Sequence, residues 1–151
     1  MAARLKNTPD IDFSDVSKHT GYHIRRAHTY FSRAFIEFGR RFDLRSQQAT
    51  ILSLTEKNPG ITPARIADAN DIKRTLVAKL TTDLKKRGLI KSRTSDIDRR
   101  QTGLHLTAKG RKFLHHVMAT FAKELDPELT RNLTAAEKKT LIRLLKKVYQ
   151  D

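Results

Sequence analysis

The sequence contains no cysteine and no tryptophan, and it has only four prolines and six glycines in 151 residues. The absence of cysteine excludes disulfide bonds, thiolate zinc sites and cysteine nucleophiles. No apolar run approaches the roughly 18 residues of a membrane-spanning helix, and the first residues, MAARLKNTPDIDF, lack the apolar core of a signal peptide. Glycine-rich phosphate loops and the G-x-S-x-G pattern of hydrolases are also absent. We therefore expect a cytoplasmic protein with no membrane partner, no cofactor and no enzymatic activity.

Acidic residues are few relative to basic ones. The chain has 16 Asp and Glu against 31 Lys and Arg, which gives a formal net charge of +15. The surplus is concentrated in residues 73–100, where ten basic residues accompany three acidic ones. A local surplus of this kind is typical of proteins that neutralise nucleic-acid phosphates. Composition alone leaves a second interpretation open, in which the charge only keeps a solvated surface soluble.

The middle of the chain predicts two short helices joined by a turn. Thr62-Pro63 suits an N-cap and a first helical position, and it predicts a helix over 63–69. Asn70-Asp71 predicts a turn, and a second helix is expected from about 73 to 87, ended by Gly88. The apolar residues at helical spacing in this second helix are Leu76, Val77, Leu80 and Leu84. Together these elements form a helix-turn-helix.

After Gly88 the apolar period changes from about 3.6 to 2, which predicts strands over 89–94 and 101–106 and a hairpin tip between them. A hairpin beside a helix-turn-helix makes a winged helix. In its tip, we expect Asp98 to hold Arg100 by paired hydrogen bonds, which leaves Arg99 to enter the minor groove of DNA. The alternative is a mutually neutralised surface loop of little energetic importance.

The second helix is expected to enter the major groove of double-stranded DNA, where its N-terminal residues meet the base edges. The candidates for base and phosphate contacts lie on caps, on the polar side of this helix or on the wing: Ser46, Gln47, Thr62, Arg65, Lys73, Arg74, Thr75, Lys79, Arg93, Arg99 and Arg100.

Amphipathic helices are also predicted on both sides of the winged helix. Residues 20–42 carry an aromatic stripe that needs a partner, and Ser46 is expected to cap a helix over 46–57. A helix over 107–126 is expected to end at Pro127, and the capping box Thr134-Ala-Ala-Glu137 opens a last helix through 149. The predicted fold class is mainly α with a small β-hairpin wing.

Several segments of the chain match a known pattern without a gap: Ile66–Ile72, Thr75–Leu84, Lys86–Ile90, Asp96–Arg100 and Leu106–Gly110. The most specific of them is Asp-Arg-Arg at the wing tip, followed six residues later by Leu-Thr-x-x-Gly. With these segments the chain resembles the MarR family of winged helix-turn-helix transcription regulators. It departs from the family pattern at Asn70, Lys73 and Leu76-Val77-Ala78, which bears on the start and the base contacts of the recognition helix.

The resemblance implies a homodimer that reads a pseudo-palindromic operator with half-sites about one helical turn, ~34 Å, apart. It implies a division into an N-terminal part of the dimerisation and ligand region (1–43), a DNA-binding domain (44–106) and C-terminal dimerisation helices (107–151). The residues expected in the dimer interface are Phe13, Val16, Leu141, Leu145 and Val148. It further implies a small-molecule effector, commonly an anionic aromatic, that binds between these parts and releases a repressor from DNA.

Gly21-Tyr-His-Ile-Arg-Arg-Ala27 looks like the start of the first helix in family members that control the catabolism of aromatic acids, some of which sense the aryl-CoA thioester. This likeness makes Tyr22, His23, Arg26 and Tyr30 candidate ligand-binding residues, through stacking and anion pairing. Core packing for Tyr30 and plain surface exposure for His23 and Arg26 are the alternatives.

Two rival functions are open to the sequence. A metalloenzyme is disfavoured because His19 and His23 lack the acid of an H-E-x-x-H pattern and the adjacent His115-His116 point to different faces of a helix. A sequence-neutral architectural protein that binds DNA or RNA would be served equally well by the charge of +15. The affinity of such a protein would depend on salt concentration and on the length of the nucleic acid, but not on its sequence. A regulator would instead prefer one sequence.

Overall fold

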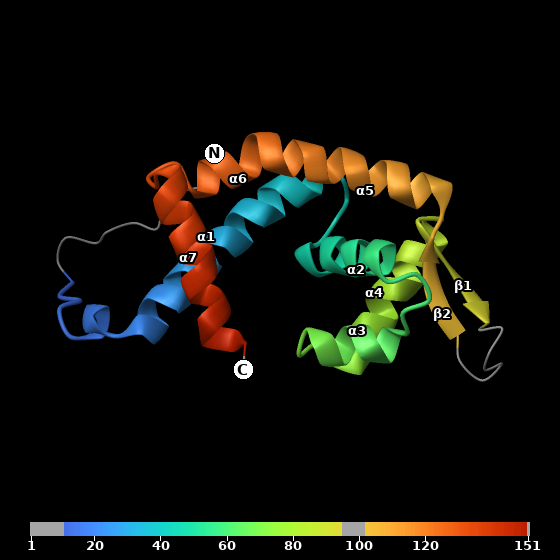
Figure 1. Cartoon of the computed structure of the whole chain (residues 1–151), viewed down its shortest axis with the longest axis horizontal. Coiled ribbons are helices and arrows are strands. Elements are labelled where there is room, and N and C mark those ends of the chain that lie inside the picture. The colour runs from blue at the N-terminus through green and yellow to red at the C-terminus, as the bar shows by residue number, and fades with distance from the viewer. Residues whose placement is uncertain (1–10, 95–101, 151) are drawn as a thin grey trace.

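The computed structural model describes residues 11–94 and 102–150, and these form a mainly helical structure with one two-stranded hairpin (Figure 1). The elements in chain order are the 3-10 turn η1 (Val16–Lys18), α1 (Thr20–Arg40), α2 (Ser46–Lys57), α3 (Pro63–Ala69), α4 (Arg74–Lys86), β1 (Ile90–Thr94), β2 (Thr102–Leu106), α5 (Ala108–Thr120), the π-helical turn η2 (Phe121–Leu125), α6 (Asp126–Leu129) and α7 (Ala135–Tyr149). The predicted fold class, a winged helix-turn-helix between flanking helices, is confirmed. No helix in the described ranges is long and apolar enough to span a membrane.

Helices α2, α3 and α4 pack with the hairpin around one apolar core. Ile51 and Leu52 of α2, Ile66 of α3 and Leu84 of α4 are fully buried, and so is Leu104 of β2. In α2 and α4 the buried residues recur at intervals of three and four positions, because that spacing places side chains on one face. The core fixes how these helices are turned, and therefore which residues of α4 reach solvent.

The hairpin is anchored to the segment before α3. Its strands pair antiparallel, with Ile90 opposite Leu106. The Gly60 N–H donates to the Leu104 carbonyl (2.8 Å), and the Leu104 N–H donates to the Ile61 carbonyl (2.9 Å). A Cβ atom on Gly103 would lie 2.4 Å from the Gly60 carbonyl oxygen, so only glycine permits this approach. The wing is thereby held at a fixed place beside the helix-turn-helix.

Helix α1 meets the C-terminal helices through aromatic side chains. The ring of Phe38 lies 5.7 Å from that of Phe35 and 5.9 Å from that of Phe121 in η2. The next residue after α1, Arg41, donates hydrogen bonds to Glu124, which lowers the pKa of that carboxyl. The predicted helix end at 42 is two residues too late, because the Leu44 N–H bonds the Gly39 carbonyl (2.9 Å) and turns the chain towards α2.

Two further boundary predictions are wrong. Pro127 does not end its helix: it lies in the first turn of α6, and Figure 1 shows α5, η2 and α6 as one continuous rod. Proline is tolerated there because its missing N–H is not needed in a first turn, and the wider turn η2 precedes it. Ser46 is not the cap of α2 but its first residue. The cap position belongs to Arg45, whose N–H donates to Oε1 of Gln48 (3.0 Å).

Helix α7 begins with the predicted capping box and carries an uncovered apolar face. The Glu137 N–H donates to Oγ1 of Thr134 (3.3 Å), and the Thr134 N–H donates to the Glu137 carboxylate (2.8 Å), which lowers the pKa of that carboxyl. Leu141, Leu145 and Val148 are all exposed in the single chain. Such a row of apolar side chains is expected to be covered by a second copy, in agreement with dimerisation through the terminal helices.

Candidate nucleic-acid interface

Helix α4 has one buried and one exposed side. Val77, Leu80 and Leu84 are buried, and this fixes the rotation of the helix about its axis. Thr75 and Lys79 lie on the opposite side and are exposed. Lys73, at the N-cap position, and Arg74 are exposed as well. The described candidates on α4 are therefore directed away from the core, as base and phosphate contacts require.

Leu76 is not on the buried side of α4, where the sequence pattern predicts it. Its exposed fraction is 37%, against 0% for the adjacent Val77. Successive helical residues are about 100° apart, so two neighbours cannot both occupy the centre of one face. Val77 takes that place, and Leu76 joins the exposed residues at the start of the helix. Adjacency alone could not have identified this residue, because the neighbours Ile51 and Leu52 of α2 are both fully buried.

Arg74 is held by a residue that the sequence did not identify. Its Nη2 donates to both carboxylate oxygens of Asp68 in α3 (3.1 and 3.2 Å), and its Nε donates to Oδ1 (3.3 Å). The two side chains are 72% and 61% exposed, so the pair contributes little energy in water. Arg74 can therefore exchange Asp68 for a nucleic-acid acceptor.

The other described candidates lie at the edges of the same unit. Thr62 caps α3 as predicted, since the Arg65 N–H donates to its Oγ1 (3.3 Å), and the Arg65 side chain reaches solvent. Gln47 is exposed in the first turn of α2, where it accepts a hydrogen bond from the Ser46 hydroxyl (3.2 Å). Arg93 is exposed on β1. The wing residues Asp98, Arg99 and Arg100 lie outside the described residues.

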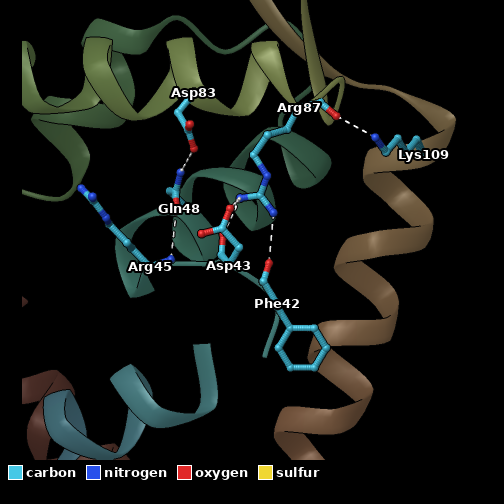
Figure 2. Close-up of polar contacts among 7 residues, drawn as sticks. All are labelled: Phe42, Asp43, Arg45, Gln48, Asp83, Arg87 and Lys109. Atoms are coloured by element: carbon cyan, nitrogen blue, oxygen red, sulfur yellow. Dashed lines mark hydrogen bonds and ion pairs between the residues drawn. The ribbon is translucent and has the colours of Figure 1, made fainter. Parts of the chain in front are cut away.

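Four hydrogen bonds hold α4 and the residue after it against the rest of the chain (Figure 2). The amide of Gln48 in α2 donates to the Asp83 carboxylate (2.7 Å). The guanidinium of Arg87, just after α4, donates to the carbonyls of Phe42 (3.0 Å) and Asp43 (2.5 Å). The Lys109 ammonium in turn donates to the Arg87 carbonyl (2.8 Å). The recognition helix is thus tied to the loop that joins α1 to α2.

The same loop lines a cavity of about 460 Å³ between the end of α1 and the start of α2. Its walls are apolar at Phe35, Ile36 and Leu44, and its lining also includes Arg40 and Arg45. The Arg40 guanidinium donates to the Glu37 carboxylate (2.9 Å). The remaining lining residues are Ser32, Gly39, Asp43, Ser46 and Gln47. Apolar walls with a few cationic groups suit a small anionic molecule with an apolar body.

The predicted ligand residues gather elsewhere, near the beginning of α1. The Tyr22 ring lies 5.4 Å from the His23 ring, and the Arg26 guanidinium lies 5.7 Å from the Tyr22 centroid. His23 bonds the Ser17 carbonyl through Nε2 (2.8 Å). None of these residues, nor Tyr30, lines the cavity at the other end of α1. The chain therefore offers two separate candidate ligand sites.

Three of the four histidines considered as metal ligands, His23, His115 and His116, contact other residues. His115 bonds Glu56 of α2 through Nε2 (2.8 Å), and the edge of the His116 ring packs against Phe42 at 5.7 Å. Within residues 11–94 and 102–150, no group of three or more His, Cys, Asp or Glu side chains is placed to hold a metal ion.

Comparison with known proteins agrees with this geometry. The model of the MarR family matches residues 42–101. A Thauera aromatica protein named "Putative transcriptional regulatory protein for hcr operon" is 31% identical over 135 residues, which cover 87% of this chain and 79% of that protein. The structure of the transcriptional repressor CouR bound to a 23-mer DNA duplex matches with a TM-score of 0.87 and 27% identity, over 93% of this chain and 99% of CouR. A cysteine-to-serine mutant of Escherichia coli MarR in complex with operator DNA matches with a TM-score of 0.79 and 25% identity, over 91% and 97% of the two chains.

The fold and the exposed cationic helix define a winged helix-turn-helix protein that binds DNA. The chain belongs to the MarR family and is a DNA-binding transcription regulator.

Proposed function

We propose that the chain acts as a homodimeric repressor that binds a pseudo-palindromic operator and leaves it when a small anionic aromatic molecule binds. The observation that carries the DNA part is the orientation of α4. Buried Val77 and Leu84 hold the helix so that Thr75 and Lys79 face outward, beside a wing anchored at Gly60. The N-terminal turn of α4 enters the major groove, and the other predicted contacts bind the adjacent backbone.

The dimer part is supported by the uncovered apolar face of α7. A homodimer places two α4 helices about one turn of DNA apart, ~34 Å, which matches an inverted repeat. Residues 44–106 then act as the DNA-binding domain, while 1–43 and 107–151 join the two copies.

The effector part is supported by the cavity between α1 and α2. Phe35 and Ile36 offer apolar surface to an aromatic ring. Arg45 can pair with a ligand carboxylate, and Arg40 can do so by exchanging its exposed partner Glu37. The cavity wall includes Asp43, whose carbonyl accepts a hydrogen bond from Arg87. A ligand that moves this loop therefore moves the end of α4 as well, which links occupation of the cavity to DNA affinity.

Selection of randomised duplex DNA on the purified protein tests the DNA part. At about physiological salt, where non-specific phosphate binding is weakened, we expect enrichment of an inverted repeat. Measurable binding without any enriched motif would favour the sequence-neutral architectural protein instead.

The variant Arg74→Ala distinguishes two roles for Arg74 in the interface with DNA. A changed base preference is expected, with a discrimination of roughly 1–3 kcal/mol at one position, whereas an equal loss on all sequences would make Arg74 a phosphate contact.

Release of the enriched duplex tests the effector part with three probes: benzoate, 4-hydroxybenzoate and benzoyl-CoA. We expect at least one to release the DNA from the wild type and to lose this effect in Arg40→Ala or Arg45→Ala. Arg26→Ala is the matched control for Arg40→Ala, because it removes a guanidinium from α1 at the other candidate site. Sensitivity of Arg26→Ala alone would move the ligand to the Tyr22 cluster, and no release by any probe would contradict this effector class.

A further inference from the structure

We propose that Leu76 is a specificity-determining residue that contacts the C5 methyl group of a thymine in the operator. The inference rests on the proposed entry of α4 into the major groove. It assigns a base-reading role to an apolar side chain that the sequence pattern places in the core.

Leu76 is presented on a regular and well-anchored turn. Its N–H donates to the Lys73 carbonyl (2.9 Å), and the Val77 N–H donates to the same carbonyl (3.2 Å). Val77 and Leu80, which follow Leu76 in the helix, are buried in the core, so the backbone under Leu76 has little freedom to move. A contact made by Leu76 therefore costs the rotamer freedom of its side chain but no further ordering of the backbone.

The surroundings of Leu76 indicate what covers it. Lys73 and Lys79 are three residues away on either side, which makes them its neighbours on the helix surface, and both are exposed. Two ammonium groups beside an apolar side chain are complementary to a partner that has an apolar group between phosphates. In the major groove of DNA, the C5 methyl of thymine is the apolar group that base pairs display. Leu76 therefore supplies apolar contact where the lysines supply charge neutralisation.

Deoxyuridine substitution tests this assignment on the intact protein. In the duplex enriched by selection, each thymidine of a half-site is replaced in turn by deoxyuridine, which removes only the methyl group. At one position we expect wild-type binding to weaken about fourfold, as for the loss of one buried methyl-sized group. Leu76→Ala should bind the thymidine and deoxyuridine duplexes equally, because its side chain no longer reaches the methyl. Leu76→Met is the matched control and should keep most of the preference.

Each other outcome overturns a distinct claim. If Leu76→Ala keeps the full thymidine preference, or if no thymine methyl in the half-site affects wild-type binding, Leu76 does not read thymine while the regulator assignment stands. If no motif is enriched at all, the proposed function fails, and this inference fails with it. Should Leu76→Ala fail to fold, Leu76→Ser carries the same comparison, because serine has no methyl group to contact the thymine.

Discussion

Removal of the Arg87 side chain tests how firmly the recognition helix is held. In Arg87→Ala, the carbonyls of Phe42 and Asp43 lose hydrogen bonds of 3.0 and 2.5 Å from a charged donor whose side chain is only 22% exposed. Hydrogen bonds of this type contribute about 1.5–3 kcal/mol each. Because water can reach the exposed Asp43 and replace part of the loss, we expect a decrease of about 2–3 kcal/mol in the free energy of unfolding.

Thermal melting measures this decrease. For a chain of 151 residues, each kcal/mol corresponds to about 2–4 °C, so Tm should fall by about 4–12 °C. The comparison requires equal protomer concentrations, since the stability of a dimer depends on concentration. Arg87→Lys is the matched control: its ammonium is a point charge that can bond one carbonyl, and it should recover part of the loss. An Arg87→Ala protein that melts within about 1 °C of the wild type and binds the operator equally well would refute the role given to these contacts.

Four further changes test other parts of the molecule. Gly103→Ala should cost about 2 kcal/mol, because its Cβ atom meets a carbonyl oxygen at 2.4 Å; an unchanged Tm would show that the wing shifts freely. Leu145→Asp should give monomers or unfolded chain in light scattering, since a charge would enter the apolar interface; a dimer of unaltered affinity would place the interface elsewhere. Glu137→Gln should lower Tm at pH 7, and this difference should vanish as the pH falls through the lowered pKa of Glu137, because the stabilisation belongs to the ionised carboxyl; a difference that stays constant with pH would contradict this. Asp68→Asn should strengthen binding to random DNA more than binding to the operator, and equal changes in the two Kd values would show that the Arg74 pair plays no part in discrimination.

The local elements were predictable because short-range rules determine them. The change of apolar period after Gly88 located the wing, and the hydroxyl caps at Thr62 and Thr134 marked helix starts that the structure confirms. The errors came where two local rules compete. Proline is common both just after a helix and in the first turn of one, and Pro127 is in the second situation. Serine is a favourable N-cap residue, but Arg45 takes the N-cap position of α2 because its N–H bonds the Gln48 side chain. Tertiary packing decides such cases.

The contacts that position the recognition helix were beyond the reach of sequence patterns. Arg87 bonds carbonyls 44 and 45 residues away, and Gln48 bonds Asp83 across 35 residues. No periodicity links residues at such separations. In contrast, the exposed cations of α4 were predictable, because helical spacing separates them from the buried side. The exposed face of α4 was therefore predictable from the sequence, whereas the contacts between its end and the loop beside the cavity needed the fold.

The pairing of Arg74 with Asp68 bears on a difficulty that any strongly basic regulator faces. A protein with a net charge of +15 binds every stretch of DNA to some degree, because phosphates are the same everywhere. An exposed ion pair contributes about 0–1 kcal/mol, whereas a bidentate contact of arginine with guanine O6 and N7 discriminates by roughly 1–3 kcal/mol. Under the proposed base contact, Arg74 would leave Asp68 for a correctly placed guanine, because that contact is the stronger of the two. Random DNA offers Arg74 mainly phosphate oxygens, which the carboxylate of Asp68 repels. We therefore propose that Asp68 weakens non-specific binding more than specific binding, just before the most basic part of the chain.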